Sequence, residues 1–144
     1  MTSTSRNTTS INPPDHVEGK KLKHILIVDD DFEVTETLKH TLTREGYKVS
    51  VAADGNAGIA HAEIQQPDLL ILDLMMPKRS GFLVLEYLRQ SENGLNIPVI
   101  MITGNQGNRH REYAELLGVS DYIQKPFAMD QILGSVKSVL LGEH

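Results

Sequence analysis

The chain has 144 residues, enough for one domain with a single core, and 40% of them are hydrophobic, an ordinary share for a globular protein. Its formal net charge is −5, and because residues 1–24 contribute +2, the remaining acidic body is a poor candidate for direct nucleic-acid binding. There is no cysteine for disulfides or thiol chemistry and no apolar run long enough to span a membrane, so we expect a cytoplasmic protein without a membrane partner.

The first 23 residues are rich in Ser, Thr and Asn and hold few aliphatic side chains. Burial of so little apolar surface cannot offset the entropy of ordering a chain, so we expect residues 1–23 to form a disordered N-terminal extension. From residue 24 onward, short apolar runs alternate with segments of helical periodicity. Strands are predicted at 25–28, 47–53, 69–72, 97–102 and 121–124, and helices at 34–45, 54–66, 81–90, 113–117 and 129–140.

This alternation predicts an α/β domain, in which a doubly wound parallel sheet of five strands is covered by five helices on both faces. At its centre is the run Leu69–Leu72, four aliphatic residues that are typical of a strand buried on both sides. The run ends at Asp73, and Pro77 four positions later disfavours further strand pairing. Asp73 is therefore expected at the carboxyl end of a central strand, the usual ligand position in an open α/β sheet.

Three other predicted strands also lead into polar side chains. These are Asp29, Asp30 and Asp31 after the first strand, Thr103 after the fourth and Lys125 after the fifth. Because the carboxyl ends of parallel strands meet at one edge of a sheet, we expect these side chains to converge with Asp73. Two carboxylates about 4 Å apart repel by roughly 4 kcal/mol at an effective dielectric near 20. The cluster therefore needs a counter-charge, which the lysine and a hard divalent cation such as Mg²⁺ would supply.

In their order and spacing, these motifs resemble the receiver domain of bacterial response regulators over residues 24–141. The matching pieces are Ile25–Asp31, Asp73–Pro77 with Gly81, Ile102–Gly104 and Asp121–Phe127. The resemblance implies a flavodoxin-like sheet with strand order 2-1-3-4-5. Residues 142–144 are then a short C-terminal end, and the sequence as given predicts a stand-alone receiver, similar to a chemotaxis regulator, without an output domain. A domain cut from a longer polypeptide and a phosphorelay intermediate remain alternatives.

The resemblance also implies a phosphoacceptor and a metal site. Asp73 corresponds to the residue that takes a phosphoryl group from a phosphohistidine on a partner protein. Asp29 and Asp30 correspond to the acidic pair that holds Mg²⁺ or Mn²⁺, Asp30 directly and Asp29 mainly through water, together with Asp73 and the backbone carbonyl of Met75. Asp31 lies just past this pair, where we expect an acid of the first helical turn.

Three further residues correspond to parts of the family's switch. Thr103 matches the hydroxyl that bonds the phosphoryl oxygens, and Lys125 matches the cation that pairs with them. Tyr122 matches the aromatic switch residue, although a permanently half-buried core aromatic is an equal alternative. In the family the peptide bond between Lys125 and Pro126 is usually cis.

The implied function is that of a phosphoprotein in two-component or phosphorelay signalling rather than that of an enzyme, apart from self-phosphotransfer and slow self-dephosphorylation. The partners would be a sensor histidine kinase or a histidine phosphotransfer protein, and an output protein bound through the face of the fourth helix, fifth strand and fifth helix. Met75 and Asn105 occupy positions that tune self-dephosphorylation in the family, and an apolar Met75 predicts a long-lived phosphorylated state. The alternative is a degenerate receiver, a protein-binding module that is never phosphorylated, which the complete set of site residues disfavours.

Overall fold

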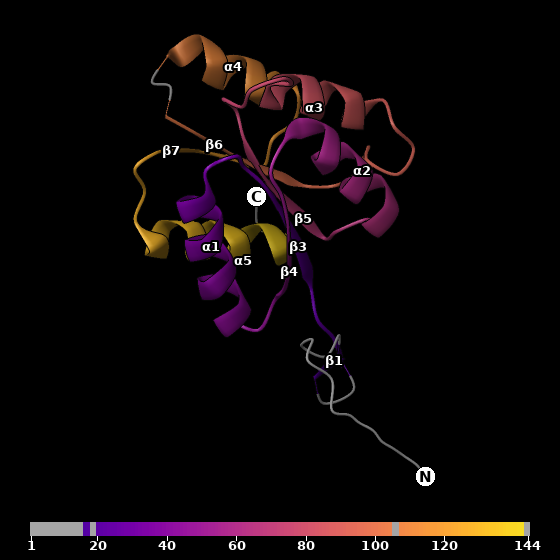
Figure 1. Ribbon diagram of the computed structural model, residues 1–144, viewed down its shortest axis with the longest axis vertical. Coiled ribbons are helices and arrows are strands. Elements are labelled where there is room, and N and C mark those ends of the chain that lie inside the picture. The colour runs from indigo at the N-terminus through magenta and orange to yellow at the C-terminus, as the bar shows by residue number, and fades with distance from the viewer. Residues whose placement is uncertain (1–15, 18–19, 105–106, 143–144) are drawn as a thin grey trace.

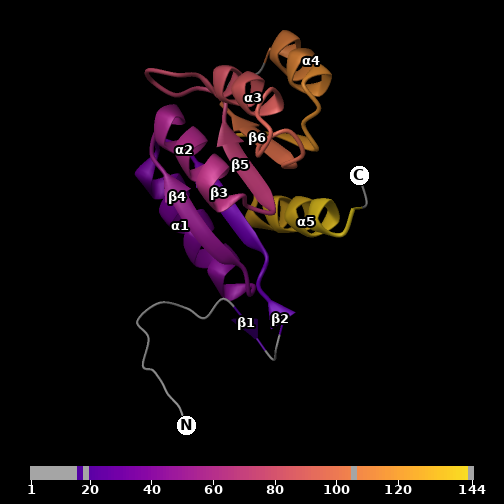
Figure 2. The ribbon, with the colours of Figure 1, turned by 90° about the vertical axis from the view of Figure 1, so that its right-hand side faces the viewer.

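The computed structural model describes residues 16–17, 20–104 and 107–142. Residues 1–15 and 18–19 of the predicted disordered extension, Asn105 with its neighbour at 106, and residues 143–144 lie outside the described residues. Within that extension, His16–Val17 (β1) and Lys20–Lys21 (β2) instead pair as a two-stranded antiparallel sheet beyond the amino end of the main sheet (Figures 1 and 2). This pairing uses backbone groups, which side-chain composition does not reveal.

The main sheet contains five strands in the described part of the chain. They are His24–Val28 (β3), Lys48–Ala52 (β4), Leu69–Asp73 (β5), Val99–Thr103 (β6) and Asp121–Gln124 (β7). All neighbouring strands are parallel, and their order is β4-β3-β5-β6-β7. Counted within this sheet, the order is 2-1-3-4-5, which confirms the predicted flavodoxin-like topology.

Helices cover both faces of this sheet (Figures 1 and 2). Phe32–Arg44 (α1) and Met129–Leu140 (α5) lie on one face, and Gly55–Gln65 (α2), Gly81–Arg89 (α3) and Asn108–Leu116 (α4) lie on the other. Each face has its own hydrophobic cluster, because side chains alternate between the two sides of a strand. Every helix in the described residues is too short or too polar to cross a bilayer.

The central strand β5 is fixed by burial on both sides. Leu70 and Leu72 belong to the cluster under α2, α3 and α4, whereas Leu69 and Ile71 belong to the cluster under α1 and α5. All four side chains are fully buried, and each contributes about 1.5–3 kcal/mol to folding. Asp73, the last residue of β5, is therefore held at the carboxyl edge by a strand that cannot shift easily.

Helix boundaries follow local capping signals. Asp31 begins α1 and accepts hydrogen bonds from two backbone N–H groups, and Asp54 begins α2 by accepting one from Ala57 at 2.9 Å. Gly46, which follows α1, has φ +99°, the left-handed conformation that glycine adopts readily. The predicted strand at 97–102 begins only at Val99, since Pro98 has no N–H to donate to a ladder.

Candidate functional site

The predicted acidic residues meet at the carboxyl edge of the sheet. Asp29 follows β3, and Asp73 ends β5 beside it. Oxygen atoms of Asp29, Asp30 and Asp73 all lie within 4.8 Å of one another, with Asp29 and Asp73 buried and Asp30 exposed. Carboxylate oxygens in such a cluster suit a hard divalent cation, and Mg²⁺ in particular binds through one or two carboxylates while keeping several waters.

Lys125 faces this cluster from the end of β7. Its Nζ donates to Oδ2 of Asp29 at 2.9 Å and lies 3.7 Å from Oδ1 of Asp73. Its backbone N–H donates to the carbonyl of Thr103 at 2.7 Å, which fixes the lysine to the end of β6, and its peptide bond to Pro126 is cis. Burial lowers the pKa of Lys125, but the hydrogen bond with Asp29 and the nearby carboxylates outweigh burial, so its pKa is raised and the side chain stays cationic.

Asp73 has an unusual protonation equilibrium. Burial and the negative charge of Asp29 raise its pKa to about 7, although Lys125 and the N–H of Met75, which donates to Oδ1 of Asp73 at 3.2 Å, act in the opposite direction. The cationic charge available from the protein is thus too small to keep this carboxylate fully ionised at neutral pH. An added divalent cation would meet that deficit, so the residues present fit the metal that the sequence predicts.

Backbone N–H groups orient the carboxylates of the cluster. The N–H of Asp31 donates to Oδ1 of Asp29 at 2.9 Å, as that of Met75 does to Asp73. Met75 lies in the turn directly after β5, and its side chain is 56% exposed beside the site. Asp31 is the N-cap of α1 rather than a residue of its first turn, and its contact with Asp29 was not foreseen from the sequence.

The two predicted switch residues lie on adjacent strands. Thr103 ends β6 and is fully buried. Tyr122 lies on β7, where it pairs with Met101 of β6. This pair is two residues short of Thr103 and the carboxyl edge, so Tyr122 lies outside the carboxylate cluster. The half-buried ring of Tyr122 packs on the hydrophobic cluster under α2, α3 and α4. The guanidinium of Arg111 lies 5.8 Å from the centroid of this ring. The hydroxyl of Tyr122 is buried and has no hydrogen-bond partner among the described residues.

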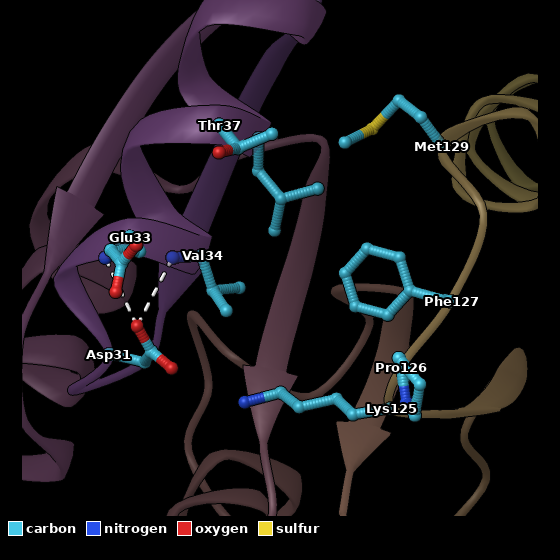
Figure 3. Close-up of a pocket in the computed structure, with 9 residues that line it drawn as sticks. Asp31, Glu33, Val34, Thr37, Lys125, Pro126, Phe127 and Met129 are labelled. Atoms are coloured by element: carbon cyan, nitrogen blue, oxygen red, sulfur yellow. Dashed lines mark hydrogen bonds between the residues drawn. The ribbon is translucent and has the colours of Figure 1, made fainter.

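A groove runs beside the site, between α1 and the segment that joins β7 to α5 (Figure 3). Its volume is about 490 Å³, and its lining includes the apolar side chains of Val34, Leu38, Pro126, Phe127 and Met129. Figure 3 shows Phe127 and Met129 facing α1 across the groove, with the Lys125 amine pointing toward Asp31 at one end. The sequence does not reveal this groove, because its two walls, α1 and the segment after Lys125, are far apart in the chain.

The chain is an α/β domain with a doubly wound sheet of five parallel strands. Its carboxylate cluster and lysine lie at the carboxyl edge of this sheet, at the point where the strand order reverses and where such domains usually bind their ligands. The family model of the response regulator receiver domain matches residues 25–137. The chain belongs to this family, whose members act in two-component signalling.

Individual relatives agree with this assignment. The chain is 37% identical over 118 residues to the alkaline phosphatase synthesis transcriptional regulatory protein PhoP of Bacillus subtilis, with 82% of this chain and 48% of PhoP covered. The chain spans about half the length of the curated relatives it matches. Among solved structures, a CheY-like receiver domain from Methanospirillum hungatei gives a TM-score of 0.80 at 31% identity, covering 85% of this chain and 97% of that one. Chemotaxis protein CheY4 of Vibrio cholerae gives 0.77 at 28% identity, covering 82% and 98%.

Proposed function

We propose that the chain is a phosphoacceptor, which takes a phosphoryl group onto Asp73 from a phosphohistidine of a sensor histidine kinase or a histidine phosphotransfer protein. Mg²⁺, or Mn²⁺, would be held by Asp29, Asp30, Asp73 and the backbone carbonyl of Met75. The observation that carries this proposal is the placement of Lys125, whose Nζ lies 3.7 Å from the buried carboxylate of Asp73 at the sheet edge.

In the transfer, an oxygen of Asp73 forms the new bond to phosphorus while the phosphorus–nitrogen bond of the phosphohistidine breaks and its electron pair stays on the histidine nitrogen. A carboxylate is a weak nucleophile for this step unless the charge on the transferring group is neutralised by position. When bound by Asp29, Asp30, Asp73 and the carbonyl of Met75, the cation would supply charge stabilisation at the phosphoryl oxygens. Lys125, whose Nζ lies 3.7 Å from Oδ1 of Asp73, would supply a second positive charge, and Thr103 would supply a hydroxyl donor.

The phosphodonor would dock over the groove between α1 and the β7–α5 segment. That groove presents apolar side chains directly beside Lys125, and Phe32 at the start of α1 leaves a 74% exposed ring near the same edge. Burial of such side chains drives most protein association, so a partner that presents its histidine there gains contact area next to the reacting atoms.

The output would be a protein contact through α4, β7 and α5, not catalysis on another substrate and not direct binding of nucleic acid. Covalent phosphate adds about −1.5 to −2 charges next to Thr103, at the end of the strand that precedes α4. Such a local charge can bias an element that has two arrangements. We propose that this activity takes place in the cytoplasm.

The test is phosphorylation of the full chain with acetyl phosphate, and activation with beryllofluoride, each with Mg²⁺ and with EDTA. We expect mass spectrometry to find only the unmodified chain in EDTA and a phosphorylated species with Mg²⁺, and we expect this species to be absent in Asp73→Asn. A folded chain that is modified under neither condition would instead support the degenerate receiver, a binding module independent of phosphorylation.

A further inference from the structure

We infer that Asp31 is a positioning residue for the metal site, which holds the carboxylate of Asp29 in its ligating orientation without supplying an oxygen to the metal cluster. This inference rests on the proposed metal site and adds a residue to its support. Asp31 is not among the three residues whose oxygens gather there, Asp29, Asp30 and Asp73.

Both the backbone and the side chain of Asp31 form hydrogen bonds. Its backbone N–H donates to Oδ1 of Asp29 at 2.9 Å. Its own Oδ1 accepts from the N–H groups of Glu33 at 3.0 Å and Val34 at 3.2 Å, and its carbonyl accepts from the N–H of Thr35 at 3.0 Å. The residue therefore connects the first turn of α1 to the carboxylate of Asp29.

Asp29 is held on both of its oxygens. Asp31 restrains Oδ1, and the ammonium of Lys125 restrains Oδ2 at 2.9 Å. Because Asp29 is almost fully buried, few water molecules could replace either contact. The orientation of this carboxylate therefore depends on the peptide plane of Asp31.

The side chain of Asp31 sets that peptide plane. As an N-cap, Asp31 has φ −84° and ψ 107°, an extended conformation that the two side-chain hydrogen bonds stabilise. Without those bonds, the turn from Asp29 to α1 can rotate, and the N–H no longer points at Oδ1 of Asp29. Loss of a group that orients a metal ligand typically weakens metal affinity by 10–100-fold.

The chain offers a matched control in Asp54. This residue is the N-cap of α2, and its Oδ1 accepts from the N–H of Ala57 at 2.9 Å, but it is not part of the metal cluster. Asp31→Ala and Asp54→Ala each remove a helix cap and a negative charge. Each is expected to lower the thermal midpoint by roughly 3–5 °C.

The experiment is a Mg²⁺ titration of the full chain at fixed pH by calorimetry, with backbone amide NMR shifts as a second readout. We expect Asp31→Ala to raise the Mg²⁺ dissociation constant about tenfold, and Asp54→Ala to leave it within about twofold. Asp31→Asn, which keeps the capping oxygen and removes the charge, is expected to stay within roughly threefold of the unaltered chain.

Two outcomes would overturn the inference. If Asp31→Asn binds Mg²⁺ as weakly as Asp31→Ala, the effect is the lost charge rather than positioning. If Asp31→Ala binds Mg²⁺ as well as the unaltered chain while Asp73 is still phosphorylated, the inference fails and the proposed function stands. A chain that binds Mg²⁺ with the expected pattern but is not phosphorylated would support the positioning role and remove the proposed function.

Discussion

The ammonium of Lys125 is paired with Asp29, at 2.9 Å, more closely than with the proposed acceptor Asp73, at 3.7 Å. The lysine therefore compensates one buried carboxylate well and the other only in part. Burial, and after it the charge of Asp29, raise the pKa of Asp73, and Lys125 at 3.7 Å offsets them only in part. The unequal pairing also leaves Lys125 within a short movement of any anion attached to Asp73.

The first prediction concerns pH. In the metal-free chain the pKa of Asp73 rises from 3.8 to about 7 on folding. The stabilisation from this bound proton is complete below about pH 4 and is lost as the pH rises through about 7. We expect the free energy of unfolding in EDTA to fall by about 1–2 kcal/mol between pH 5 and 8, after allowance for solvent screening. Urea denaturation measures this fall, and Asp73→Asn should largely abolish it.

Met75 gives a prediction about the lifetime of the phosphorylated state. Its side chain is apolar and more than half exposed beside Asp73, so it cannot orient a water molecule for attack on the acyl phosphate. We expect Met75→Asn to speed dephosphorylation by about tenfold, equivalent to about 1.4 kcal/mol of barrier. Decay of labelled phosphate from the purified chain measures the rate, and equal rates would contradict this explanation of a long-lived state.

Gly81 permits the start of α3 to approach the proposed phosphoacceptor. A Cβ at this position would overlap the carbonyl oxygen of Asp73 and lie 2.9 Å from Cα of Leu74. Because both neighbours are backbone atoms, we expect Gly81→Ala to lower the free energy of unfolding by about 2 kcal/mol. At Gly134 in α5, an added Cβ would meet no atom within 4 Å, so Gly134→Ala should stabilise the chain by up to about 1 kcal/mol. Chemical denaturation of both variants tests the contrast.

Arg89 joins three segments around the end of α4. Its guanidinium donates to five backbone carbonyls, of Gly94, Leu95, Ile97, Leu117 and Gly118, at 3.0–3.4 Å. We expect Arg89→Met to cost about 2–3 kcal/mol, because several half-buried carbonyls lose their donor. The exposed Arg109 is the control, and Arg109→Met should change stability by less than about 0.5 kcal/mol. Hydrogen exchange at residues 117–118 should rise only in the Arg89 variant.

A variant of Tyr122 distinguishes an aromatic switch residue from a permanently half-buried core aromatic. The buried hydroxyl of Tyr122 has no partner among the described residues, so removing it relieves a desolvation cost. We expect Tyr122→Phe to leave the unphosphorylated chain as stable as before, or more stable by up to about 1 kcal/mol. If the hydroxyl acquires a partner on activation, the same variant should reduce the stabilisation by beryllofluoride. A loss above about 1 kcal/mol without beryllofluoride would show a hydrogen bond in the resting state.

Much of the architecture was predictable because it depends on local patterns. The aliphatic runs that end at Asp29 and Asp73 indicate two strands. Because parallel strands end at the same edge of a sheet, the carboxylates at their carboxyl ends lie close together. Capping by Asp54 was also predictable, since an N-cap involves only the next three residues. The confirmed strand order required the resemblance, because alternation of strands and helices alone is compatible with other orders.

Other features depend on tertiary distances that a sequence does not contain. The preference of Lys125 for Asp29 joins residues 96 positions apart. The groove arises because α1 and the segment after Lys125, also distant in the chain, lie opposite each other. The link from Asp31 to Asp29 is local, but it depends on the orientation of one peptide plane, which residue types alone do not specify.

The β1–β2 pair lies beyond the amino ends of the strands (Figures 1 and 2). The carboxylates of Asp29 and Asp73 lie at the opposite, carboxyl edge of the sheet. The length of the sheet therefore separates the two. A surface tether attached at His16 would therefore lie at the end of the sheet opposite the edge with Asp73 and Lys125. Binding of kinase and output partners is therefore best measured with the chain attached to the surface at this end.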